Sequence, residues 1–542
     1  MNISKVHIEN FKIFKGSFDL TLNKGVNILV GNNETGKSTI IEAIHLTLTG
    51  LYNGKYLKNE LTQYVFNNDV ITEYIKSLEP DSENKPLPYV LIEIYMDGEN
   101  LAEFEGDGNS KKIKASGISL RIAFDEKYQK EYEELVKIGG IKTLPIEYYN
   151  ILWSSFSRDE NITTKAIPIK SALIDSASNK SQNGSDIYIS RIVKDFLESE
   201  DIVKISQAHR QMKDFFMDNT AITEINEKIQ KDSKISNKKI ELSVELSSKN
   251  AWENSLITCI EDIPFTNIGK GQQCIIKTKL ALETKKSKEA NIILLEEPEN
   301  HLSHTKLSQL IEDISKNNSK KQILISTHNS FVANKLGLDN LILLNDKRTV
   351  RLNELSDETF QFFKKLSGYD TLRLILCEKA ILVEGDSDEL VVQKAYQVKN
   401  GLLPIENGID VISVGTSFLR FLEIAEKIQK KVAVVTDNDN DYDNKITKKY
   451  ELYADSANIN IFADNRNNLN TLEPQIVEAN KVNLATLCDI LGIDCSKYDT
   501  AEKISKYMQG DKTNSALKIF NTDKKINFPD YINNVIDWCN EQ

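Results

Sequence analysis

Two apolar runs of this chain each end in a pair of acidic residues. The first pair is Glu296 and Glu297, and the second is Asp437 and Asp439. Carboxylate oxygens suit Mg²⁺ or Mn²⁺ rather than zinc, so each pair is a candidate metal site. Ions held in this way support phosphoryl transfer and phosphodiester hydrolysis. The sequence therefore indicates phosphate chemistry at two separate acidic centres.

A third motif, near the start of the chain, has the spacing of a phosphate-binding loop. The motif Gly-x-x-x-x-Gly-Lys-Ser follows an apolar strand and precedes a segment with helical periodicity. Backbone N–H groups of such a loop surround phosphates, Lys37 would reach the β- and γ-phosphates, and the Ser38 hydroxyl would bind Mg²⁺. We therefore expect ATP to bind here. The predicted ATP-binding residues of the loop are Gly31, Asn32, Asn33, Glu34, Thr35, Gly36, Lys37, Ser38 and Thr39.

The acidic pair at 296–297 fits the second half of the same nucleotide site. Glu296 is expected to hold Mg²⁺ directly or through water, and Glu297 to orient or deprotonate the attacking water. A further strand, at residues 323–327, brings His328 to the same edge as a candidate γ-phosphate sensor. Glycines at 269 and 271 precede a predicted helix a short way upstream.

A second predicted strand also leads into acidic residues, which are candidates to join Asp437 and Asp439. Residues 381–383 form an apolar run that is followed by Glu384, a glycine turn and Asp388. If this run and the one before Asp437 are parallel strands of one sheet, their carboxyl ends meet at one edge. Four carboxylates would then surround a small volume, and like charges this close require cations. Solvated loops are the alternative interpretation.

Length and composition bound the class of protein. A chain of 542 residues predicts two to four domains. No apolar run reaches the roughly 18 residues that span a bilayer, and the start lacks a signal-peptide core, so a cytoplasmic protein without membrane contact is expected. The net charge of −12 neither supports nor excludes DNA, because bound cations restore local attraction for phosphates.

The nucleotide motifs are split by inserted sequence. Residues 157–255 are rich in Ser, Asn and Lys, with helical runs such as Val203–Met217 and little strand pattern. Their heptads are too few and too irregular for a long coiled coil, so a compact helical module is predicted.

The series of nucleotide motifs resembles the ABC-type ATPase heads of the SMC, RecF and OLD families. The resemblance implies that Gly269, Gly271 and Gln272 form a signature loop that caps the nucleotide of a partner head. It also implies that the insert serves dimerisation. A homodimer or a higher oligomer, such as a tetramer, is therefore expected.

The second acidic centre resembles a Toprim domain, and its OLD form extends the site. That resemblance implies metal ligation by Glu384, Asp388, Asp437, Asp439 and Glu473, and a role for Lys512 at the scissile phosphate. The expected fold class is α/β, with a split ABC-type head, a helical insert and a C-terminal Toprim domain with a Rossmann-like parallel sheet. The expected boundaries are 1–156 and 256–375 for the head, 157–255 for the insert and 376–542 for the Toprim domain.

The chain is thus identified as resembling OLD-family endonucleases, including the nuclease subunit of Gabija-type anti-phage defence systems. The resemblance implies nicking or cutting of double-stranded DNA with Mg²⁺ or Mn²⁺ under nucleotide control. Two alternatives stay open. One is an SMC- or RecF-like DNA-repair ATPase without nuclease activity. The other is a toxin-like effector controlled by a partner such as a UvrD-like helicase or a reverse-transcriptase complex.

Overall fold

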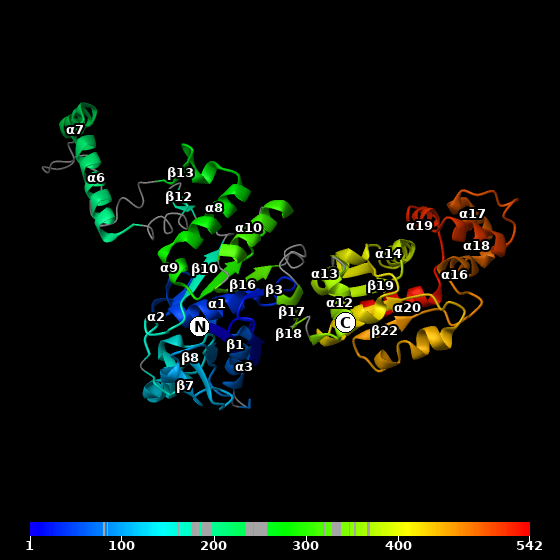
Figure 1. The fold of residues 1–542 in the computed structure, drawn as a ribbon, viewed down its shortest axis with the longest axis horizontal. Coiled ribbons are helices and arrows are strands. Elements are labelled where there is room, and N and C mark those ends of the chain that lie inside the picture. Colours follow the sequence, from blue (N-terminus) through cyan, green and yellow to red (C-terminus); the bar gives the residue numbers. More distant parts are fainter. Residues whose placement is uncertain are drawn as a thin grey trace.

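The protein consists of an N-terminal head and a C-terminal α/β domain that lie side by side (Figure 1). The computed structural model describes residues 1–79, 82–83, 85–160, 162–175, 181–182, 185–186, 197–232, 242, 257–300, 302–317, 320–327, 338–345, 347–351, 354–365 and 369–541. His328, the predicted γ-phosphate sensor, lies outside these residues. No described helix is both long and apolar enough to cross a membrane.

An antiparallel sheet forms the first layer of the head. Its strand order is β2-β1-β6-β8-β7, and β9 pairs with β8. Alternate side chains of β2 enter the core, because successive residues of a strand point to opposite faces. The strands are β1 (Asn2–Glu9), β2 (Ser17–Thr21), β6 (Val90–Asp97), β7 (Glu105–Gly106), β8 (Ala115–Phe124) and β9 (Tyr149–Ser155).

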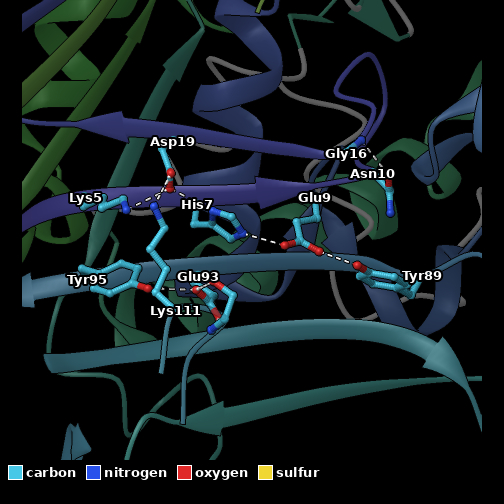
Figure 2. Close-up of polar contacts among 11 residues, drawn as sticks. Lys5, His7, Glu9, Asn10, Gly16, Asp19, Tyr89, Glu93, Tyr95 and Lys111 are labelled. Carbon is cyan, nitrogen blue, oxygen red and sulfur yellow. Dashed lines mark hydrogen bonds and ion pairs between the residues drawn. The ribbon is translucent and has the colours of Figure 1, made fainter. Parts of the chain in front are cut away.

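The other face of this sheet carries a polar network that fixes the strand register (Figure 2). The imidazole of His7 bridges Asp19 on β2, at 2.9 Å, and Glu9, at 2.8 Å. Lys5 and Lys111 also contact Asp19, at 3.0 and 2.5 Å. Burial raises the pKa of Asp19, but the hydrogen bonds from these side chains outweigh it and lower the pKa to about 2. A slip by one residue would separate these partners.

A second, mostly parallel sheet carries the nucleotide motifs. Its order is β10-β15-β16-β3-β17-β18, and only β18 is antiparallel to its neighbour. Its central strands are buried on both faces, which explains their continuous apolar sequence. The strands are β3 (Val26–Val30), β10 (Ser171–Asp175), β15 (Ile292–Glu296), β16 (Gln322–Thr327), β17 (Leu341–Asn345) and β18 (Arg348–Arg351).

Helix α1 (Lys37–Thr49) packs between the two sheets of the head, since it contacts β6 on one side and β10, β15 and β16 on the other. Gln322, at the start of β16, joins the sheets directly. Its side chain accepts a hydrogen bond from the backbone N of Ile3 at 2.8 Å and donates to the carbonyls of Ile3 and Asn23, at 2.8 and 2.7 Å. Gln322 is buried, so these bonds satisfy backbone groups that water does not reach.

The predicted start of the insert at residue 157 is wrong. Strand β10 lies inside the predicted insert, yet it pairs in parallel with β15, and Ile167 and Ile169 belong to the core of the head. The head therefore extends at least to Asp175. The sequence signal failed because the isolated apolar run Ser171–Asp175 borders polar, loop-like sequence. Beyond it, helices α6 (Ser199–Met217) and α7 (Thr220–Asp232) project away from the head, as the helical prediction requires (Figure 1).

The C-terminal domain is built on a four-stranded parallel sheet with the order β20-β19-β21-β22. Helices α14 (Asp386–Asn400) and α20 (Asp530–Asn540) contact one face, and α13 (Tyr369–Leu376) and α15 (Phe418–Lys427) contact the other. The α/β fold class with a C-terminal parallel sheet is confirmed. The strands are β19 (Lys379–Val383), β20 (Ile409–Ser413), β21 (Lys431–Val435) and β22 (Ile459–Phe462).

The head and the C-terminal domain share one hydrophobic cluster. Ile28 and Val30 of β3 belong to the same buried cluster as Phe421 of α15 and Val434 of β21. A polar contact supports this junction, because the Asn345 side chain donates to the carbonyl of Ile428 at 2.8 Å. The two parallel sheets are therefore joined through packed side chains.

Replacing Gln322 with Ala should destabilise the head by about 2–4 kcal/mol, because it leaves buried backbone groups of Ile3 without partners. Scanning calorimetry would record this as a lower temperature of the first unfolding transition. Gln129→Ala, an exposed substitution in the same lobe, serves as the control and should change stability by less than about 0.5 kcal/mol. Equal melting of both variants would contradict the bridging role of Gln322.

Candidate functional site

The phosphate-loop motif forms the turn between β3 and α1. Gly36 has φ of 102°, and a Cβ atom there would lie 2.7 Å from the ring of Phe14. A Cβ atom on Gly31 would lie 2.4 Å from the carbonyl oxygen of Leu344. Only glycine fits both positions, because one lies in the left-handed region and both are tightly packed. The turn thus has the close-packed backbone that a phosphate cradle requires.

Lys37 lies over this turn and is 6% exposed. Its ammonium donates to the carbonyl oxygens of Gly31, at 2.8 Å, and Asn32, at 2.6 Å. Burial lowers the pKa of Lys37, while the nearby charges of Glu297 and Glu299 partly restore it. The structure therefore places the phosphate loop within electrostatic range of the acids that follow β15.

The acids after β15 have distinct surroundings. Glu296 ends the strand, and Glu297 follows it with φ of 41° and donates its backbone N–H to the carbonyl of Ser326 at 3.1 Å. The Asn300 side chain donates to the Glu297 carboxylate at 3.0 Å. Glu299, which the sequence analysis missed, is 6% exposed and accepts a hydrogen bond from Thr327 at 2.5 Å. The sequence feature that could have identified Glu299 is its place as the third acid of the run Glu-Glu-Pro-Glu.

The predicted signature loop lies at the start of α8 (Lys270–Glu283). Gln273 is buried, and its side-chain amide donates to the carbonyls of Phe265, Thr266 and Ile268 at 3.0, 3.2 and 2.9 Å. These hydrogen bonds hold the backbone of residues 265–268 against the start of α8. Gly269 and Gln272 are exposed, and Gly271 is half-buried. The loop is therefore presented outward, where a second molecule could reach it.

The second acidic centre lies at the carboxyl edge of the C-terminal sheet. Strands β19 and β21 are neighbours, and their register pairs Leu382 with Val434. The strands end one residue later, at Val383 and Val435, so Glu384 and Asp437 emerge at the same edge of the sheet. Asp388 joins them from the first turn of α14 and accepts a hydrogen bond from the backbone N of Gly385 at 3.0 Å. The structure therefore places these three acids at one edge of the sheet.

The closeness of the acids changes their protonation. Burial, together with the charges of Asp388, Glu384 and Glu473 and against an opposing effect of Lys512, raises the pKa of Asp437 to about 8. Burial also raises the pKa of Asp388 to about 6. Both shifts disfavour the ionised form, as expected where carboxylates share a site of low polarity.

Two elements distant in sequence complete the centre. Glu473, in the first turn of α16 (Leu472–Ala479), is 4% exposed and accepts a hydrogen bond from the Thr471 hydroxyl at 2.9 Å. Lys512 begins α19 (Lys512–Phe520), and its ammonium lies 3.5 Å from the Glu473 carboxylate. Helix α19 packs along α14, which brings Lys512 to the edge of the sheet. The structure therefore gathers both residues with the strand-end acids.

Asp439 occupies the rim of the centre rather than its middle. Its side chain is 58% exposed and forms an ion pair with Lys445 at 3.4 Å. Among the described residues, no three His, Cys, Asp or Glu side chains converge tightly enough to ligate one ion as placed. Repulsion favours carboxylate rotamers that point apart, and a divalent cation reverses that preference. The all-oxygen donor set still fits Mg²⁺ or Mn²⁺.

Three residues beneath the acids were missed by the sequence analysis. Asn438, fully buried between the two acids of its motif, donates to the carbonyls of Asp464, Arg466 and Leu469 at 2.8, 3.0 and 3.3 Å. Tyr531 donates to the side chain of Gln475 at 2.7 Å, and burial first, then Asp437 and other acids, raise its pKa. Of these three residues, only Asn438 could have been identified from the sequence, because it stands between two strand-end acids.

Metal affinity at this centre should rise with pH. Asp437 has a raised pKa of about 8, so an ion must displace its proton below that pH. Calorimetric titration with Mn²⁺ should show affinity increasing by about tenfold per pH unit from 6 to 8 and then levelling. By the same linkage, the metal-free protein loses stability as pH rises between the unfolded value near 4 and 8.

Asp437→Asn is the control for that experiment, because it removes the titrating group while keeping the size of the side chain. The variant should bind Mn²⁺ more weakly, with a flatter dependence on pH between 6 and 8. A wild-type affinity that is already constant above pH 6 would contradict the proposed displacement.

Comparison with known proteins gives partial matches at both ends of the chain. The gene product of Vibrio campbellii named DNA replication and repair protein RecF is 30% identical over 165 residues, which cover 29% of this chain and 44% of RecF. The match therefore spans less than half of that relative. The retron Ec83 probable ATPase of Escherichia coli is 36% identical over 75 residues, or 14% of this chain and 13% of that protein.

Solved structures show similarity at low scores. An Smc head bound to the C-terminal winged-helix domain of ScpA aligns with a TM-score of 0.33 and 15% identity over 65% of this chain and 99% of that one. The C-terminal region of the Burkholderia pseudomallei OLD protein aligns with a TM-score of 0.25 and 18% identity over 30% of this chain and 96% of that one.

Family matches are more specific. Residues 1–181 match the AAA ATPase domain, a range that includes β10 and agrees with the longer head. Residues 375–439 match the TOPRIM domain described as overcoming lysogenization defect protein-like, from the end of α13 to Asp439. The chain therefore combines an N-terminal AAA-type ATPase domain with a C-terminal TOPRIM domain of the OLD-like kind.

Proposed function

We propose that this protein is an ATP-binding, divalent-metal-dependent DNA endonuclease of the OLD type. The observation that carries the proposal is the meeting of four carboxylates and one lysine at the carboxyl edge of a parallel sheet. These groups belong to five elements (the ends of β19 and β21, and helices α14, α16 and α19), and they are Glu384, Asp388, Asp437, Glu473 and Lys512.

The residues of the centre have different roles in phosphodiester hydrolysis. Bound Mg²⁺ or Mn²⁺ supplies an activated water and stabilises charge on the leaving oxygen. Glu384, Asp388, Asp437 and Glu473 would hold the metal, and Asp439 would be a further ligand at the rim. Lys512 is exposed enough to meet substrate, and its ammonium would stabilise negative charge on the oxygens of the scissile phosphate. Asn438 positions the two acids that flank it.

The head would regulate this reaction. Lys37 and Ser38 would hold the phosphates and Mg²⁺ of ATP, Glu296 would complete the metal site, and Glu297 would orient water. The outward position of Gly269 and Gln272 supports their action on the nucleotide of a partner head. Exposed apolar side chains on α6, including Met212 and Phe215 at 55% and 78%, support dimerisation through the insert.

The similarity to RecF favours a second candidate, a DNA-repair ATPase without nuclease activity. That similarity covers only part of this chain, and an ATPase alone does not account for four carboxylates around Lys512.

A role in anti-phage defence, with a helicase or reverse-transcriptase partner, is part of our proposal. The match to a retron-associated ATPase supports it.

Substituting Glu384 or Asp437 with the isosteric amide should reduce cleavage of supercoiled plasmid in Mg²⁺ or Mn²⁺ by roughly 100-fold or more, because each removes a metal ligand. ATP binding should be unchanged, since neither residue lies in the head. Glu502→Gln, which removes an exposed acid on α18 (Ala501–Gly510), is the matched control and should cut normally. Normal cutting by Asp437→Asn, or no cutting by the wild type under any metal, would refute the nuclease assignment.

Lys37→Ala should weaken ATP binding by at least about tenfold, because it removes the cation that meets the β- and γ-phosphates. Fluorescent nucleotide titration measures this, with Lys58→Ala, an exposed substitution in the head, as the control. Mn²⁺ binding at the C-terminal domain should persist in Lys37→Ala. Undiminished ATP affinity would show that the loop does not bind nucleotide.

A further inference from the structure

Two lysines that no part of the proposed mechanism uses lie against the acidic centre. Lys445 forms the ion pair with Asp439 at 3.4 Å. Lys449 lies within electrostatic range of both Glu384 and Asp439, and also of Lys445. Asp439 and Glu384 therefore each have an ammonium group within electrostatic range.

The position of these lysines is built into the chain. Asp439 and Asn440 have φ of 47° and 65°, and this turn leads into a π-helical segment, Asp443–Lys448. Such segments are rare and recur at functional sites. The turn is anchored on one side by Asn438 and on the other by Ile446, which is buried in the cluster shared with the head.

Lys449 is further confined by aromatic rings. Its ammonium lies 5.6 Å from the centre of the Phe418 ring and 5.0 Å from that of Tyr450. Phe418 and Tyr450 are both buried, so the lysine is half-buried rather than free to swing into solvent. It cannot move far from Glu384 and Asp439 without losing these contacts.

Charge balance gives the lysines one role before a divalent ion binds and another role afterwards. Two ammonium groups held close together repel each other, and the neighbouring carboxylates offset that repulsion. A divalent ion ligated by Glu384 and Asp439 would take over the negative charge of those acids. The lysines would then face outward beside the metal without a countercharge, and a phosphate group is the anion that an ammonium group of this kind binds.

We propose that Lys445 and Lys449 are exchangeable counterions of the nuclease centre: they neutralise Glu384 and Asp439 until a divalent ion binds, and they then bind the phosphate backbone of the DNA strand at the metal. The inference rests on the proposed nuclease function and names the residues that position its substrate. It predicts that removing either lysine raises the affinity for the metal and lowers the affinity for DNA.

The metal effect is measured by calorimetric titration of the full-length protein with Mn²⁺ in the absence of DNA. Lys445→Gln and Lys449→Gln should each tighten Mn²⁺ binding by about two- to fivefold, because a competing cation is removed. Lys427→Gln makes the same charge change on exposed α15, at the opposite edge of the sheet, and should leave the affinity unchanged. Unchanged or weaker Mn²⁺ binding in both variants would overturn the exchange.

The DNA effect is measured by fluorescence anisotropy of a short labelled duplex in Ca²⁺ at several salt concentrations. Each substitution should weaken binding and lower the slope of log affinity against log salt by about one, the signature of one lost phosphate contact. Lys427→Gln should do neither. DNA affinity equal to wild type in Lys445→Gln and Lys449→Gln would overturn the proposal even if Mn²⁺ binding tightened.

The two failures can be told apart. If wild-type protein does not cut plasmid, the proposed function fails, whatever the lysine variants do to Mn²⁺ binding. If the wild type cuts, Glu384→Gln does not, and the lysine variants bind Mn²⁺ and DNA like wild type, only the counterion inference fails.

Discussion

Repulsion among carboxylates at the end of the C-terminal sheet is the constraint under which the rest of this domain is arranged. Burial and the charges of Glu384 and Glu473 raise the pKa values of Asp388 and Asp437, so the ionised cluster costs free energy unless countercharge is supplied. Lysines 445, 449 and 512 supply part of it from the protein itself. A cluster so unfavourable for folding is expected only where cation chemistry requires it.

The supporting layer below the acids explains how the cluster keeps its geometry. Asn438 satisfies three carbonyls of the 464–469 loop, and Gln475 and Tyr531 bond to each other under Asp437. Buried polar groups of this kind are costly when unpaired, so the loop, α16 and α20 are held in one arrangement. That arrangement delivers Glu473 to the same edge as the strand-end acids.

The shared core gives the two chemical centres a physical connection. Strand β3 leads directly into the phosphate loop, and β21 leads directly into Asp437. Side chains of both strands lie in one cluster, with Val30 and Val434 among its members. Close-packed interiors transmit displacement, so nucleotide binding at one end of this cluster has a contiguous route to the metal centre at the other.

The sequence by itself determined the local chemistry: the glycine loop with Lys37, the acidic ends of two strands, and their order along an α/β chain. These signals are short-range, because each depends on a strand followed by a turn of fixed residue types. Glu473 and Lys512 were assigned by resemblance, and their convergence depended on α19 packing beside α14 and on α16 packing beside α18. The sequence misplaced the edge of the head, since the pairing of β10 with β15 spans more than a hundred residues and leaves no local trace.

Tertiary structure alone decided that Asp439 lies on the rim beside Lys445, that Asn438 faces the 464–469 loop, and that Lys449 rests on Phe418. Such facts depend on which side chains share a small volume, and that is set by the summed packing of distant segments rather than by the pattern within any one of them.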